Sequence, residues 1–128
     1  MTGTQILAEM LIKSMIFSLA LTLAVEMGLA ALLGFRSKWE LTLVAAANVI
    51  TNPLVVFTLS LMAYFCGPGS PPQTAAEILL ELAAVMVEAL LYWKFMGAAG
   101  ARRPGPLILS ILLNAASFAA GLLVSNVL

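Results

Sequence analysis

Residues 14–34 read SMIFSLALTLAVEMGLAALLG, an apolar run in which Glu26 is the only charged side chain. A helix needs about 20 apolar residues to cross the roughly 30 Å hydrocarbon layer of a bilayer. This stretch therefore predicts a transmembrane helix, with an amphipathic lead-in that extends it to about 5–34. Apolar sequence continues past any cleavage point, which favours a retained helix over a removed signal peptide.

Three later segments have the same character, at about 39–65, 75–96 and 106–128. Charged or Gly- and Pro-rich breaks separate them at 34–38, 66–73 and 97–105. We expect no helix in 66–73, because three prolines and two glycines fall within it. Thr74, with Glu77 three residues later, predicts a capping box at the start of the third helix. The sequence thus predicts an all-α membrane protein, a four-transmembrane-helix bundle forming a single domain over 1–128.

Composition supports a lipid environment. Apolar residues make up 62% and charged residues 9% of the 128 residues, against about 45–50% and about 25% in soluble domains. The formal net charge is zero, so we expect no binding to nucleic acid. The chain has no histidine, and Cys66 is its single cysteine. An internal disulfide and a cysteine-based zinc site are therefore excluded.

The basic residues predict the orientation. Five of the six lie in or beside the first and third loops: Arg36, Lys38, Lys94, Arg102 and Arg103. The positive-inside rule then predicts an inner or plasma membrane protein with loops 35–38 and 97–105 in the cytoplasm and both termini outside. The aromatic residues Trp39, Tyr92 and Trp93 fall at the predicted cytoplasmic boundary and Tyr64 at the other, as in the aromatic belts of membrane proteins.

The two halves of the chain resemble each other. Glu26 is followed by a basic turn and then by Asn48 and Thr51, while Glu88 is followed by a basic loop and then by Asn114 and Ser117. The Glu-to-Asn spacing is 22 residues (26 to 48) in one half and 26 (88 to 114) in the other. This pattern predicts two similar parallel helical hairpins, an arrangement found in transporters built from parallel repeats.

Counting from the loops predicts that these polar groups share one depth. Glu26 and Asn48 are each 11 residues from Ser37, and Glu88 and Asn114 are each 13 residues from Ala101. Each predicted helix also carries its polar residues on one face at helical spacing. The candidate ion- or substrate-binding residues are Glu26, Glu88, Asn48, Thr51, Asn52, Asn114 and Ser117, with Glu81, Tyr92 and Thr22 as secondary candidates.

A charged side chain at the bilayer centre costs roughly 2.5–3.5 kcal/mol on insertion scales. Glu26 and Glu88 must lower this cost by binding a proton, pairing with amides or coordinating a cation. Carboxylate, amide and hydroxyl oxygens suit protons and hard cations. We expect no cofactor, no site for a soft transition metal and no catalytic set, so an enzyme is the less favoured class.

A purely structural interpretation exists for several of these groups. Ser, Thr and Asn on facing helices often form interhelical hydrogen bonds, and stripes of small residues such as Ser117, Gly121 and Ser125 allow close packing. Thr51 and Asn52 precede Pro53 and can repair the hydrogen bonds that a proline interrupts. Glu77 and Glu81 fall near the predicted outer surface, either as solvated side chains or as an acidic mouth.

The layout resembles that of the small multidrug-resistance exporters, which have four helices and a membrane-embedded Glu at a depth like that of Glu26. That resemblance implies proton exchange for a cationic drug in an antiparallel dimer. It covers layout only: the Gly, Trp and Tyr patterns of that family are absent, Glu88 has no counterpart, and the strong basic bias opposes dual orientation.

Two functions follow as hypotheses. The first is a proton- or cation-coupled transporter or channel that works as a homo-oligomer and uses the intramembrane carboxylates. The second is a non-catalytic membrane subunit or scaffold of a larger complex, since the chain has almost no extramembrane mass. An intramembrane enzyme using Glu26 or Glu88 as acid or base is a weaker third, because no nucleophile accompanies the carboxyls.

Overall fold

A computed structural model describes residues 2–96 and 103–127, with side chains up to Val124. The described chain is helical apart from its turns: α1 is Gly3–Leu32, α2 Lys38–Cys66, α3 Pro71–Phe95 and α4 Pro106–Val127. The prediction of four helices and an all-helical bundle is confirmed. Arg102 and most of the third predicted loop, with Ala101 in it, lie outside the described residues.

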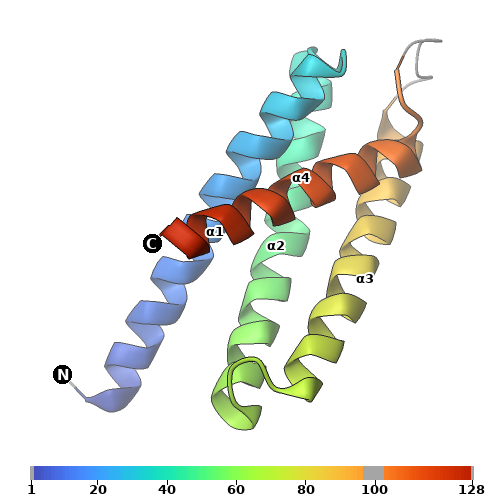
Figure 1. Ribbon diagram of the computed structural model, residues 1–128. Coiled ribbons are helices and arrows are strands. Elements are labelled where there is room, and N and C mark those ends of the chain that lie inside the picture. The colour runs from blue at the N-terminus through green and yellow to red at the C-terminus, as the bar shows by residue number, and fades with distance from the viewer. Residues whose placement is uncertain (1, 97–102, 128) are drawn as a thin grey trace.

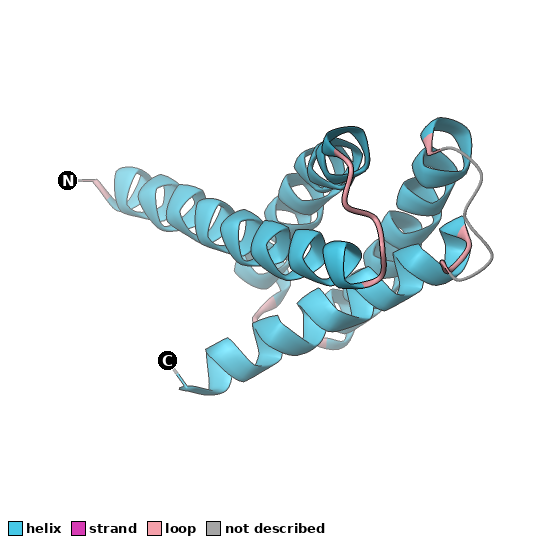
Figure 2. Ribbon diagram, turned by 90° about the horizontal axis from the view of Figure 1, so that it is seen from above, coloured by secondary structure: helices cyan, strands magenta, loops and turns pink. Residues whose placement is uncertain are grey.

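The four helices form a ring (Figures 1 and 2). α1 packs against α2 and α4, and α3 packs against α2 and α4. In the described residues the diagonal pairs, α1 with α3 and α2 with α4, make no close backbone approach. α4 crosses the other helices obliquely in Figure 1, passing from the end of α3 to the middle of α1. The second hairpin therefore differs in crossing angle from the first.

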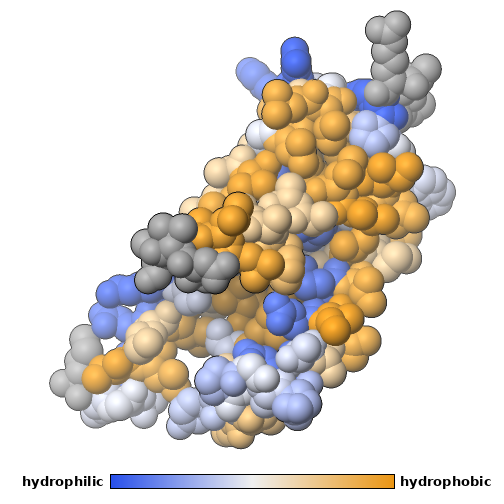
Figure 3. All heavy atoms as spheres, viewed as in Figure 1, coloured by the Kyte–Doolittle hydropathy of each residue, from blue (hydrophilic) through white to orange (hydrophobic). Residues whose placement is uncertain are grey.

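Three of the four helices, α1, α2 and α4, are long and apolar enough to cross a membrane by length and composition. α3 differs because any 18 consecutive residues of this helix contain at least three charged side chains, drawn from Glu77, Glu81, Glu88 and Lys94. The surface seen in Figure 3 is largely apolar, with hydrophilic residues in a hollow below α4.

The start of α3 corrects the sequence prediction. Pro71 and Pro72 occupy its first turn, and the Ser70 hydroxyl accepts the backbone N–H of Gln73 at 3.4 Å. The predicted start near residue 75 and the Thr74 capping box are therefore wrong, as is the exclusion of 71–73 from a helix. A proline costs nothing in the first turn, because the N–H that it lacks would have no helical partner there.

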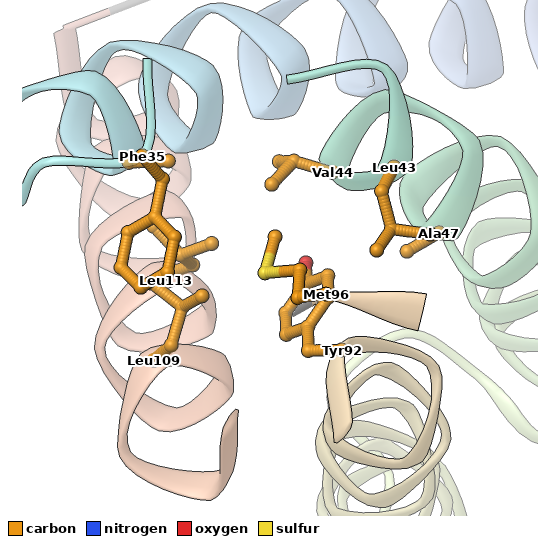
Figure 4. Packing of buried hydrophobic residues seen from close by; sticks show 9 residues of the cluster. Phe35, Leu43, Val44, Ala47, Tyr92, Met96, Leu109 and Leu113 are labelled. Carbon is orange, nitrogen blue, oxygen red and sulfur yellow. The ribbon is translucent and has the colours of Figure 1, made fainter. Parts of the chain in front are cut away.

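An apolar core fills the bundle at the end that holds the α1–α2 loop. Figure 4 shows its side chains converging from α2, α3, α4 and the loop. The buried members are Ala30, Phe35, Leu43, Val44, Ala47, Tyr92, Met96, Leu109 and Leu113. We call this cluster the apolar plug. It closes one end of the space between the helices with tightly packed side chains.

Polar contacts fasten the same end from outside the apolar plug. Arg103 forms an ion pair with Glu40 at 2.5 Å, and its guanidinium lies 4.4 Å from the centre of the Phe35 ring. The indole N–H of Trp39 donates to the Phe95 carbonyl at 2.9 Å. Arg103, just before α4, is thus joined to α2 and to the α1–α2 loop. The Trp39 contact joins the start of α2 to the end of α3.

The aromatic residues of the predicted belt divide into two groups. Trp39, Tyr64 and Trp93 are exposed, which is compatible with the predicted belt. Tyr92 is fully buried in the apolar plug, so its placement in the belt is wrong. Its ring points between the helices because it lies one turn from Glu88 on the inner face of α3.

Candidate functional site

Glu88 links three helices from the inner face of α3. The carboxyl is fully buried. The Thr51 hydroxyl on α2 donates to Oε1 at 3.1 Å, and the Asn114 amide on α4 donates to Oε2. One donor therefore faces each carboxylate oxygen, an arrangement that stabilises the ionised form in place of water.

Glu26 on α1 is also fully buried, but its surroundings differ. Neither of its carboxyl oxygens has a hydrogen-bond partner among the residues that the structure describes. Asn48 and Ser117 are its nearest polar neighbours, yet neither side chain reaches hydrogen-bond geometry with it. The Glu88 charge also acts on it. The two carboxyls thus lie near each other in the interior of the bundle.

The Glu and Asn of each half meet as their spacing predicts, but the hydroxyl residues exchange partners. Asn114 binds the Glu88 of its own hairpin, whereas Thr51 reaches Glu88 from the other hairpin. Asn48 lies beside Glu26 of its own hairpin, and Ser117 approaches Glu26 from the other. Spacing alone gave no sign of this exchange.

The hydrogens of several neutral groups are already committed to backbone carbonyls. The Asn48 amide nitrogen donates to Val44 at 2.9 Å, and the Ser117 hydroxyl donates to Asn114 at 3.1 Å. The Thr51 hydroxyl lies 3.0 Å from the Ala47 carbonyl and shares its single hydrogen between that oxygen and Glu88. Back-bonding of this kind fixes side chains on their own helices.

Asn52 and Thr22 form a second contact between α1 and α2. The Asn52 amide donates to the Thr22 hydroxyl at 3.3 Å. The amide oxygen of Asn52 has no hydrogen-bond partner within the described parts of the chain. Both residues line the cavity, in agreement with the predicted inner faces, and their contact is with each other rather than with the two carboxyls.

Ser110 joins the site although the candidate set omitted it. It is fully buried, and its hydroxyl donates to the Val85 carbonyl at 2.7 Å. Asn114 donates back to the Ser110 carbonyl at 2.9 Å, which orients the amide toward Glu88. The sequence carried the signal, since Ser110 lies one helical turn before Asn114 on the same stripe.

A cavity of about 220 Å³ leads toward these groups from the end opposite the apolar plug. Its deep wall carries Asn48, Thr51, Asn114 and Ser117, and its shallow wall carries Glu77 and Glu81. The two shallow carboxylates are half-buried and line the cavity, which favours the acidic mouth over fully solvated side chains. The hollow below α4 in Figure 3 is the visible side of this region.

The arrangement can hold a small cation or a proton, since every polar atom at its centre is oxygen or amide nitrogen. Within the described residues, no group of three or more His, Cys, Asp or Glu side chains gathers as a metal centre. Protein-family models, curated proteins and solved structures contain no match to this chain.

Proposed function

We propose that this chain is an integral membrane protein of four spanning helices that moves a proton or hard cation by reversible binding at Glu26 and Glu88. One observation carries the proposal: two fully buried carboxyls lie next to Asn48, Thr51 and Asn114, which line the inner part of a cavity that has an acidic mouth. A chain that needed only packing would avoid the cost of carboxyls at this depth.

In this proposal α3 is the fourth membrane-spanning helix, although it carries charged residues. Its 25 residues extend about 37 Å at ~1.5 Å per residue, enough to cross a bilayer. Glu88 is buried and Glu81 lines the cavity, so these charges turn away from lipid. The outer face is apolar and exposed, with Ile78, Leu79, Leu82, Met86, Val87 and Leu90.

The exchange of hydroxyl partners between hairpins supports an internal repeat. Thr51 of the first hairpin donates to Glu88 of the second, and Ser117 of the second hairpin lies near Glu26 of the first. Corresponding residues of the two halves therefore lie close to the carboxyl of the opposite half. A pseudo-two-fold axis along the membrane normal produces this pattern, as in parallel transporter repeats. The oblique course of α4 is the departure from that symmetry.

Orientation follows from the basic loops, which the proposal keeps in the cytoplasm with both termini outside. The cavity mouth then opens to the outside, and the apolar plug seals the cytoplasmic end. Cations would be drawn to the mouth by Glu77 and Glu81, since no lysine or arginine lines the cavity among the described residues.

Labelling of single cysteines tests this orientation. Cys66 is exposed at the end of α2. It is expected to react with a membrane-impermeant maleimide in intact cells, because the α2–α3 turn lies outside. In a Cys66→Ser background, Ser37→Cys is expected to react only after permeabilisation, and this exchange keeps all six basic residues. The reverse pattern would invert the topology.

Ion flux into proteoliposomes tests the function itself. Vesicles containing the protein are expected to take up protons or Na⁺ down an imposed gradient, as followed by an internal pH- or Na⁺-sensitive dye. Glu26→Gln and Glu88→Gln are each expected to slow uptake at least about tenfold, equal to about 1.4 kcal/mol on the barrier. Glu9→Gln is the matched control, because it removes an exposed carboxyl from the same helix as Glu26.

Equal flux in all variants would contradict transport through these carboxyls. The alternative function, a non-catalytic subunit of a larger complex, then predicts a stoichiometric membrane partner after gentle detergent extraction. A homo-oligomer, which we also expect for the transporter, would instead copurify only with itself. The exposed apolar side chains serve lipid or protein neighbours equally well, so extraction and flux together separate the two functions.

A further inference from the structure

Of the three buried polar groups that have no partner within the described residues, the Asn52 amide oxygen belongs to the cavity wall, and two lie at the centre of the ring: the Glu26 carboxyl and the Tyr92 hydroxyl. Both residues are fully buried. Tyr92 lies one helical turn after Glu88 on α3, and it packs in the apolar plug with Ala30, one turn after Glu26 on α1, so the three groups lie in one neighbourhood. Unpaired groups at this depth are costly, because protein interiors pair nearly all of their buried polar atoms.

Glu88, unlike Glu26, has hydrogen-bond partners. Its two oxygens accept hydrogen bonds from Thr51 and Asn114, so its charge is held by fixed donors on α2 and α4. The two carboxyls therefore have different tasks. Glu88 is the carboxyl that fixed donors already hold, and Glu26 is the carboxyl left open for a ligand.

The unpaired oxygens around Glu26 favour a cation over a proton alone. A single proton can join at most two of the three unpaired oxygens, the two of Glu26 and the one of Tyr92, whereas a cation can contact all three at once. Oxygens that bind a single hard cation at about 2.3–2.6 Å lie farther from one another than hydrogen-bonded oxygens do. The lack of hydrogen bonds at these three buried oxygens within the described residues is therefore compatible with a cation between them.

Each helix supplies one oxygen to this space. Glu26 comes from α1 and Tyr92 from α3. Ser117 comes from α4, and its only hydrogen is committed to the Asn114 carbonyl, so its lone pairs remain available. Asn48 comes from α2 and can turn its amide oxygen to an ion. A single ligating carboxylate matches the charge of a monovalent ion.

We propose that Glu26, Tyr92, Ser117 and Asn48 bind one dehydrated monovalent cation of the size of Na⁺, with the Glu88 carboxyl beside the site. This inference rests on the proposed function and names the ion. The acidic cavity leads the cation to the site from one side, and the apolar plug beyond Tyr92 blocks its exit on the other.

Calorimetric titration of the purified full chain with NaCl tests the site, at constant pH and with choline chloride holding ionic strength constant. We expect saturable binding of one Na⁺ per chain. Tyr92→Phe keeps the ring and removes the hydroxyl, so it is expected to weaken binding at least about tenfold, as loss of even an outer-shell partner commonly does. Tyr64→Phe makes the same change at an exposed tyrosine and is expected to leave binding unchanged.

Glu26→Gln is expected to abolish the Na⁺ signal. Absence of Na⁺ binding to the native chain would overturn the cation site, and so would equal binding by Tyr92→Phe and Tyr64→Phe. If Na⁺ fails to bind while Glu26→Gln slows proton uptake, the proposed transport stands and the cation site falls. If Na⁺ binds while the native chain gives no flux, the site stands and transport falls.

Discussion

Tyr92→Ala is expected to lower the free energy of unfolding by about 3–5 kcal/mol, the usual cost of truncating a buried aromatic residue. Tyr92 is among the largest fully buried side chains, and it packs in the apolar plug with Leu109, Leu113 and Met96. In lipid the loss comes from packing contacts, since a lipid tail cannot enter the space left behind. Titration of the micelle-bound protein with a denaturing detergent measures the change.

Two other tyrosine variants show whether the loss of stability comes from the buried ring of Tyr92. Tyr64→Ala truncates an exposed tyrosine and is expected to change stability by no more than about 0.5 kcal/mol. Tyr92→Phe keeps the packing and is expected to stay close to the native stability, because the hydroxyl has no partner among the described residues. If Tyr92→Ala were no worse than Tyr64→Ala, Tyr92 would not lie in the bundle interior.

Asn114→Leu is expected to cost about 1.5–3 kcal/mol, the worth of a hydrogen bond to a charged group. The substitution keeps the approximate volume and removes the donor to one Glu88 oxygen. Glu88→Leu is expected to cost a similar amount, because one hydrogen of the Asn114 amide loses its acceptor, while the Thr51 hydroxyl keeps the Ala47 carbonyl. The same detergent titration measures both.

The stability of the double variant shows whether Glu88 and Asn114 interact. Glu88→Leu with Asn114→Leu replaces both partners by apolar groups and is expected to be more stable than the sum of the single changes predicts. Thr22→Val combined with Glu88→Leu is the control cycle, since the Thr22 hydroxyl contacts Asn52 and not Glu88. That pair is expected to add within about 0.5 kcal/mol. Additivity of the Glu88 and Asn114 changes would contradict their contact.

Periodicity and counting from the loops predicted much of the candidate site. They placed Glu26, Asn48, Glu88 and Asn114 on inner faces at matched depth, and the structure brings all four to the centre of the ring. These features depend only on helical spacing and on where each helix turns back. Both can be read from this sequence, because long apolar runs give the helices and the breaks between them give the turns.

The features that sequence reasoning missed depend on how helices rotate and cross. The reach of Thr51 to Glu88 and the burial of Tyr92 depend on the packing of α2 against α3, which no single helix specifies. The pair of Glu40 with Arg103 joins residues 63 positions apart. The early start of α3 was missed because Pro71 and Pro72 were interpreted only as helix breakers.

The ring arrangement has a mechanical consequence for the two carboxyls. Neighbouring helices touch, whereas α1 and α3 stand on one diagonal of the ring and carry Glu26 and Glu88 respectively. If the bundle parts into two pairs of neighbouring helices, whichever pairs these are, Glu26 and Glu88 fall on opposite moving bodies. A cation bound between the two carboxyls would therefore link the two bodies in either division of the ring. Its release would remove that link in both.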